Sequence, residues 1–292
     1  MSSPANPQFD PEPLPSDSQP AAPPLAEAPP SPALLPTLRQ PKAGENPVWN
    51  GWDVLQVAGF TLLILFLAQL AIVVGVRHFI LRHSSWLEIA QNPGLALLSE
   101  FLTYIVVAMY MVLLVEGKYH VRFGDAIRWN WPGAATFSFL AIGVLMLGFD
   151  MLGRFLPMPK TTPFDQFFAR PFDAYLTAVF AVTLGPLMEE LFFRGFLYPV
   201  LARRLGIFWG IILTAVPFGL IHAVQYGYAW GAVLVIFLVG VVLTTVRAAT
   251  KSVGASFLAH VGYNGTLMVI SLIATDGFRH MEKAGVFLLS SS

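Results

Sequence analysis

The chain has 292 residues, of which 55% are hydrophobic and 12% charged, with a formal net charge of zero at pH 7. Soluble domains usually carry about 25% charged residues, so this composition indicates a membrane protein, and the balanced charge argues against a nucleic-acid partner. The chain contains no cysteine, which excludes disulfides, iron–sulfur clusters, thiolate metal ligands and cysteine lipidation, so any metal would need histidine and carboxylate ligands.

Residues 1–47 differ in composition from the rest of the chain. They contain fourteen of the 23 prolines, mixed with alanine and serine, and Phe9 is their only aromatic residue. Such a segment buries too little apolar surface to offset the entropy lost on ordering. We therefore expect a disordered N-terminal tail.

The remaining sequence consists mainly of apolar stretches of membrane-spanning length. A span needs about 20 mainly apolar residues. The helices that this criterion predicts lie near residues 52–76, 95–115, 134–152, 174–198, 207–224, 231–247 and 254–275. The predicted fold is an all-α, polytopic transmembrane helical bundle with about seven or eight spans. We expect an integral multi-pass protein, in contact with the lipid bilayer of the plasma membrane.

Charged side chains interrupt the fourth predicted span, where residues 189–194 read EELFFR. A charge at the centre of a lipid-facing helix costs roughly 2.5–3.5 kcal/mol, so these charges need partners or a function. Glu190 and Arg194 are four residues apart on one helical face, which predicts an ion pair. Glu189 lies about 100° around the helix and does not share that partner. An unpaired membrane carboxylate is a candidate functional residue.

Two later spans carry further polar residues. The sequence FGLIH ends at His222, with Phe218 on the same helical face, and HVGYN runs from His260 to Asn264, which also share a face. A single membrane histidine is more often a hydrogen-bonded packing residue than a catalyst. Polar groups on three neighbouring apolar spans, however, are inexpensive to bury only where they meet. The sequence therefore predicts one shared polar site.

Other polar residues receive a structural or a minor role. Asp150 and Arg154 are four residues apart at a span end and are expected to pair. Glu100, near the start of its span, is a candidate for facing a hydrated cavity. Gln225 and Tyr226 directly follow the FGLIH sequence and are candidates for lining a substrate path.

The three sequences resemble the motifs of a known family, the CAAX prenyl protease type 2 and bacteriocin-processing (CPBP, or Abi) family of intramembrane endopeptidases. The family motifs are EExxxR, FxxxH and HxxxN or HxxxD, and they match EELFFR, FGLIH and HVGYN in the same order. The resemblance covers about residues 170–275, roughly a third of the chain. It divides the chain into a tail (1–47), N-terminal transmembrane helices (48–170), a catalytic CPBP-like helical core (171–275) and a short C-terminal tail (276–292).

The resemblance also implies roles for the motif residues. Glu189 matches the catalytic glutamate and His222 the histidine that helps to activate water, while His260 and Asn264 match the residues that hold the oxyanion. The residues implied as structural support are Glu190, Arg194 and Phe218. This set suits peptide hydrolysis, which needs a general base for water and donors for the oxyanion. The implied function is an intramembrane endopeptidase that cleaves a membrane-associated protein or peptide.

Three alternatives stay open at the level of sequence. Glu189, His222 and His260 are also suitable ligands for a His₂Glu zinc site, and the family has often been described as metalloproteases, although no compact HExxH pattern is present. No cofactor is favoured, and zinc is the alternative. Because the wider family is linked to bacteriocin self-immunity, a non-enzymatic immunity or scaffold protein is the second alternative. A transporter or proton relay is the third, and would need a continuous polar path across the membrane.

Overall fold

The structure is a computed structural model that describes residues 1–2, 38–40, 46–156, 159 and 161–280. It divides into two compact units, Met1–Thr37 and Leu38–Ser292. Only residues 1–2 of the first unit are described, so nearly all of the predicted disordered tail lies outside the described residues. Most of the predicted C-terminal tail, after residue 280, lies outside them as well.

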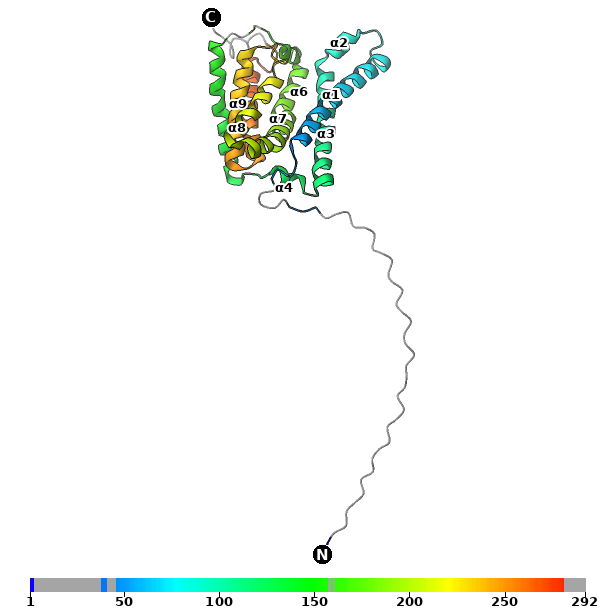
Figure 1. The fold of residues 1–292 in the computed structure, drawn as a ribbon. Helices are drawn as coiled ribbons and strands as arrows, with labels where there is room; N and C mark the ends of the chain where they lie inside the picture. The colour runs from blue at the N-terminus through cyan, green and yellow to red at the C-terminus, as the bar shows by residue number, and fades with distance from the viewer. Residues whose placement is uncertain (3–37, 41–45, 157–158, 160, 281–292) are drawn as a thin grey trace, which may run out of the picture. The chain divides into compact units, whose positions relative to one another are not determined.

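The second unit is helical, as predicted, and its described residues contain no β-strand beyond one isolated bridge between Arg39 and Val121 (Figure 1). The α-helices are α1 (Gly51–Phe79), α2 (Trp86–Ala90), α3 (Pro93–Leu113), α4 (Phe123–Ile127), α5 (Thr136–Met146), α6 (Pro171–Val182), α7 (Leu184–Glu189), α8 (Tyr198–Ile221), α9 (Trp230–Thr250) and α10 (Val253–Ala274). Two π-helical segments, η1 (Leu114–Lys118) and η5 (Glu190–Leu197), extend α3 and α7. The 3-10 segments are η2 (Gly133–Ala135), η3 (Leu147–Phe155) and η4 (Pro163–Phe168).

Side-chain caps fix the beginnings of three long helices. The Asn50 side chain accepts hydrogen bonds from the backbone N–H groups of Trp52 and Asp53, and the Asp53 carboxylate accepts one from the Asn50 N–H at 3.0 Å. Asn92 and Ser252 cap α3 and α10 through their side chains in a similar way. Such caps satisfy N–H groups that have no partner inside the helix, so the sequence defines these helix starts locally.

Six helical stretches among the described residues are long and apolar enough to cross a membrane, fewer than the seven or eight predicted. The difference arises because the predicted spans 174–198 and 207–224 fall within one stretch of 51 residues, Pro171–Ile221. At 1.5 Å per residue, a straight helix of that length would measure about 75 Å, more than twice the roughly 30 Å of bilayer hydrocarbon. The chain changes direction at Gly206, whose φ of 84° and ψ of 166° are not helical.

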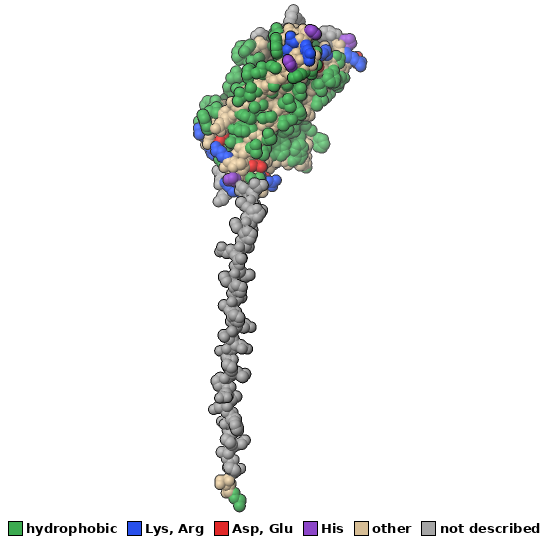
Figure 2. All heavy atoms as spheres, turned by 90° about the vertical axis from the view of Figure 1, so that its right-hand side faces the viewer, with side chains coloured by type: hydrophobic (Ala, Val, Ile, Leu, Met, Phe, Trp, Pro, Cys, Tyr) green, Lys and Arg blue, Asp and Glu red, His purple; other side chains and the backbone are tan. Residues whose placement is uncertain are grey.

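The outward face of the helical unit is strongly apolar. On α1, Leu62 and Phe66 are 69% and 64% exposed. Figure 2 shows hydrophobic side chains over most of the face it views, with Lys, Arg and His side chains gathered toward its ends. A soluble monomer rarely exposes so large a continuous apolar surface, whereas bilayer hydrocarbon covers it without cost. The protein is therefore an integral membrane protein.

Two of the apolar clusters hold together the helices that carry the motifs. In the first, the Trp49 ring stacks on Phe196 with 4.3 Å between ring centroids, and the Trp49 indole N–H donates to the Phe196 carbonyl at 2.9 Å. This cluster joins the start of α1 to η5, which carries part of the EELFFR motif. The second cluster contains Phe218, Leu243 and Tyr263 and joins α8, α9 and α10. The later motifs thus lie on helices that share one core.

Helices α5 and α10 approach each other closely because glycines face both backbones. A Cβ atom added at Gly143 would lie 2.2 Å from the Ala259 carbonyl oxygen, and one added at Gly262 would lie 2.4 Å from the Leu140 carbonyl oxygen. Small residues allow this kind of backbone contact between membrane helices. The contact fixes α10, which carries the HVGYN sequence, against the bundle.

Candidate active site

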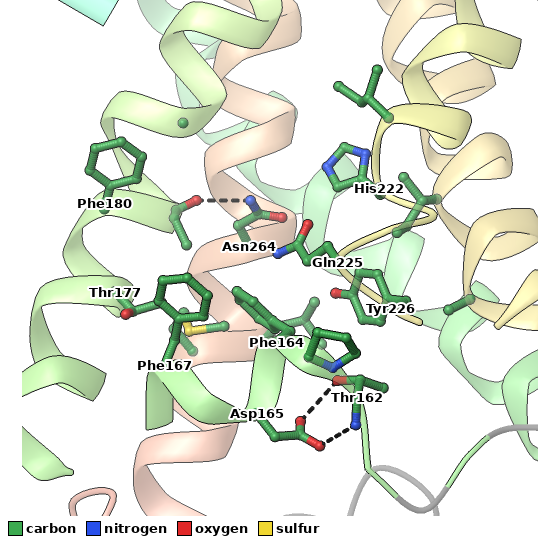
Figure 3. A pocket seen from close by; sticks show the side chains of 18 of the residues that line it. Thr162, Phe164, Asp165, Phe167, Thr177, Phe180, His222, Gln225, Tyr226 and Asn264 are labelled. Atoms are coloured by element: carbon green, nitrogen blue, oxygen red, sulfur yellow. Dashed lines mark hydrogen bonds between the residues drawn. The ribbon is translucent and has the colours of Figure 1, made fainter. Parts of the chain in front are cut away.

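The three motifs meet at one cavity with a volume of about 980 Å³, part of which is drawn in Figure 3. Glu189 reaches it from the end of α7, His222 from the residue after α8, and His260 and Asn264 from α10. The structure thus brings together all four residues that the sequence analysis placed at the site.

A buried ion pair lies directly behind the cavity wall. Arg194 Nη1 donates to Glu190 Oε1 at 2.8 Å, and both side chains are 0% exposed. Arg194 also donates to the Gly240 carbonyl at 3.2 Å, and its guanidinium carbon lies 4.3 Å from the Phe218 ring centroid. The predicted Glu190–Arg194 pair is therefore present. Buried charges persist only where partners and hydrogen bonds are this complete.

Glu190 also holds His260 in place. Glu190 Oε1 lies 2.9 Å from His260 Nδ1, and the Ser256 hydroxyl donates to Glu190 Oε2 at 2.5 Å. With Nδ1 donating to this carboxylate, Nε2 is the nitrogen that the ring presents toward Glu189. Ser256 lies outside the three motifs and was not among the predicted site residues. Its position four residues before His260, on the same face of α10, was the available signal.

Glu189 lies between two imidazole rings. Its Oε1 is 3.8 Å from His222 Nε2, and its Oε2 is 3.7 Å from His260 Nε2. Both distances exceed the hydrogen-bond range, and separations of this kind suit a bridging water. The His222 Nδ1 donates to the Phe218 carbonyl at 2.8 Å, so the neutral ring directs its Nε2 lone pair toward Glu189. The arrangement joins an unpaired carboxylate to an imidazole acceptor in a cavity.

Asn264 is anchored through one of its amide hydrogens. Its Nδ2 donates to the Ala181 carbonyl at 2.8 Å, as the dashed line in Figure 3 shows. An amide nitrogen carries two hydrogens, so one donor remains for a bound group. Asn264 therefore combines a fixed orientation with a free donor at the cavity.

Acidic residues from outside the motif region also line the cavity, among them Glu100 and Asp150. Glu100 on α3 accepts a hydrogen bond from the Tyr104 hydroxyl at 2.7 Å, and it faces the cavity as the sequence analysis suggested. Asp150 accepts one from Tyr263 at 3.0 Å. The side chain of Arg154 is outside the described part of the chain, so the predicted Asp150–Arg154 pair is not tested.

Gln225 and Tyr226 also line the cavity, in the turn between α8 and α9. Burial, reinforced by the negative charge of Asp150, raises the pKa of Tyr226 to about 12. Below that pH, Tyr226 stays a neutral hydroxyl that can both donate and accept hydrogen bonds.

The zinc alternative can be compared with this geometry. Among the described residues, no group of three or more His, Asp and Glu side chains is arranged to hold a metal ion. Zinc ligand atoms lie about 2.0–2.2 Å from the metal and surround it tetrahedrally. Since Glu189, His222 and His260 do not form such a group in the structure, the chemistry proposed below is derived from the side chains alone.

Part of the chain matches a known protein family. Residues 171–266 match the family described as Type II CAAX prenyl endopeptidase Rce1-like. The match runs from α6 into α10 and contains all three motifs, whereas α1, α3 and α5 lie outside it. No curated protein and no solved structure matches the chain significantly. The match supports the family that the three motifs indicate, and over residues 171–266, about a third of the chain, the protein is similar to Rce1-like endopeptidases.

Proposed function

We propose that this protein is an intramembrane endopeptidase, in which Glu189 and His222 activate water to hydrolyse a peptide bond of a membrane-associated substrate. One observation carries the proposal. Glu189 stands 3.7–3.8 Å from two imidazole nitrogens, without a direct hydrogen bond to either, in a cavity enclosed by membrane helices. An unpaired carboxylate in such a place is costly unless it serves a function.

The proposed reaction begins with a water molecule between Glu189 and His222. Glu189 accepts a proton from this water while the water oxygen adds to the scissile carbonyl carbon. His222 Nε2 orients the water. The carbonyl oxygen becomes an oxyanion near Asn264 and His260, where the free amide hydrogen of Asn264 is available as a donor. As the C–N bond breaks, Glu189 passes its proton to the leaving nitrogen. The products are a carboxylic acid and an amine.

The cavity favours a substrate with substantial apolar surface. Its lining is mostly apolar, with Phe164, Phe167 and Phe180 among the aromatic contributors (Figure 3). The matched family is named for CAAX prenyl substrates, which carry a lipid on a cysteine near the C-terminus. We propose this substrate class as the first to test. We also propose that the protein resides in the plasma membrane, which fractionation of cells that express it would test.

The direct test uses the full chain in liposomes and a fluorogenic peptide that ends in a farnesylated Cys-aliphatic-aliphatic-X sequence. We expect release of the three C-terminal residues, identified by mass spectrometry, by the wild-type protein. Empty liposomes serve as the blank. Absence of cleavage by a correctly folded wild-type protein would favour the non-enzymatic immunity or scaffold alternative for this substrate class.

The metal question has its own test. Because the proposed reaction needs only side chains and water, 1,10-phenanthroline should leave the cleavage rate within twofold of the untreated rate. Loss of activity with the chelator and recovery on adding Zn²⁺, with an unreactive phenanthroline isomer as control, would replace this mechanism with the zinc-dependent one.

A further inference from the structure

One polar side chain at the cavity has no part in the reaction proposed above. Gln225 lies in the turn between α8 and α9 and lines the cavity together with Glu189 and Asn264. In Figure 3 its side-chain amide points into the cavity toward Asn264. Within the described residues, this amide makes no hydrogen bond, although it carries two donor hydrogens and one acceptor oxygen.

The backbone around Gln225 is held from two sides. Its carbonyl accepts a hydrogen bond from the Phe164 N–H at 3.1 Å, and the N–H of Tyr226 donates to the His222 carbonyl at 3.1 Å. The first bond ties the turn to η4, and the second ties it to the end of α8. The base of the Gln225 side chain is therefore fixed relative to His222, which lies at the reaction centre.

The surroundings explain why an amide here needs a ligand. Phe164 and Phe180 belong to the same cavity wall, and the Asn264 amide already donates to Ala181. The half-buried Gln225 amide makes no hydrogen bond to the described protein residues, so its partners are water or a group that enters the cavity. Its paired donor and acceptor match the N–H and C=O groups of an extended peptide main chain.

We propose that the Gln225 amide binds the peptide main chain of the substrate next to the scissile bond and so positions that bond over Glu189. The inference rests on the proposed function, because it needs a peptide in the cavity. It adds a substrate-binding residue outside the EELFFR, FGLIH and HVGYN sequences, in a turn that joins two of the spans.

The first test compares Gln225→Leu, which has a similar volume but no hydrogen-bonding group, with the wild type on the farnesylated peptide. We expect kcat/KM to fall roughly 5- to 20-fold, mainly through a higher KM, because binding to an unreacting part of the main chain is lost. Gln225→Asn keeps the amide, so its kcat/KM should fall less than that of Gln225→Leu. Gln91→Leu, the same substitution at an exposed position outside the cavity, should stay within twofold of the wild type.

The second test identifies the group that Gln225 contacts. In a peptide series, one backbone amide at a time is replaced by an ester, which removes its N–H. One ester near the scissile bond should weaken cleavage by the wild type but cause little further loss in Gln225→Leu, since the two changes remove the same hydrogen bond. Equal losses in both proteins at every position would contradict a main-chain contact.

The outcomes separate the two proposals. A folded wild-type protein that does not cleave the peptide overturns the proposed function. A wild type that cleaves, together with a Gln225→Leu variant within twofold of it, overturns the role of Gln225 alone. Where Gln225→Leu fails to fold, Gln225→Glu replaces it, because it keeps the shape and the acceptor while removing the donors and should again raise KM.

Discussion

Glu189 and Glu190 are neighbours in the sequence but have opposite surroundings. Glu190 is fully buried and bonded to Arg194, Ser256 and His260. Glu189 is 20% exposed and keeps 3.7 Å or more from the nearest imidazoles. The bonds of Glu190 give the site its rigidity, and the unused oxygens of Glu189 give it reactivity.

The first prediction concerns this rigid part. Arg194→Ala leaves Glu190 buried without its cation, which costs about 3–5 kcal/mol for a broken buried pair. We expect a clearly lower melting temperature in detergent and reduced peptide cleavage. Arg204→Ala removes the same charge from an exposed position and serves as the control. An Arg194→Ala protein that melts with the wild type would contradict the structural role of the pair.

For single residues, the sequence predicted the contacts that depend on spacing within one helix. The Glu190–Arg194 pair follows from a separation of four residues, which places both side chains on one face. The contact of Glu190 with His260 joins residues 70 positions apart, and their separation in sequence says nothing about their distance in space. Ser256 was missed for the same reason, since its partner is on another helix.

Among the elements, the contact between α5 and α10 controls where the HVGYN residues lie. Gly143 on α5 faces the backbone of α10 so closely that a Cβ would come within 2.2 Å of a carbonyl oxygen. This oxygen belongs to Ala259, the residue before His260. A change in the helix spacing here would therefore move His260 relative to Glu189.

The second prediction follows from that contact. Gly143→Ala should destabilise the protein by about 1–3 kcal/mol, because the added methyl group forces the two backbones apart. Cleavage activity should fall with the displacement of His260. Gly148→Ala is the matched control, since Gly148 is the second residue of η3 and a Cβ there meets nothing within 4 Å. Equal melting temperatures for the two variants would contradict the close approach.

The sequence predicted the positions of the helices better than the number of membrane spans. Apolar length and capping residues such as Asn50 and Ser252 are local signals, and helix boundaries came within a few residues for α9 and α10. The count of six is slightly lower than predicted because two predicted spans fall within one helical stretch, Pro171–Ile221, which turns at Gly206. The π-helical segment η5 has no distinct sequence pattern, since its form depends on how its side chains pack against neighbouring helices.

For the whole molecule, the composition alone was sufficient to predict a membrane protein. A chain with 12% charged residues presents an apolar exterior and buries part of its few charges beside one cavity, where Glu190 and Arg194 pair. The contribution of α3 to that cavity, through Glu100, comes from outside the family match, and the sequence suggested it only by a carboxylate near the start of an apolar span. Helix packing, rather than any motif, brings it there.

The third prediction tests the lipid-facing exterior. Leu62, near the middle of α1, is 69% exposed. Leu62→Arg should hinder insertion, at a cost of roughly 2.5–3.5 kcal/mol for a charge at a helix centre. We expect less protein in the carbonate-resistant membrane fraction, whereas Leu62→Phe should insert normally. Equal insertion of both variants would show that this face of α1 does not contact lipid.

The central claim is that Glu189 activates the water that cleaves the peptide. The most direct measurement compares the wild type with Glu189→Gln on the farnesylated peptide in H₂¹⁸O, with product masses as the readout. The wild type should place one ¹⁸O atom in the new carboxylate, and Glu189→Gln should stay in the membrane, keep its melting temperature and form almost no product. A folded Glu189→Gln protein that cleaves at nearly the wild-type rate would contradict the account.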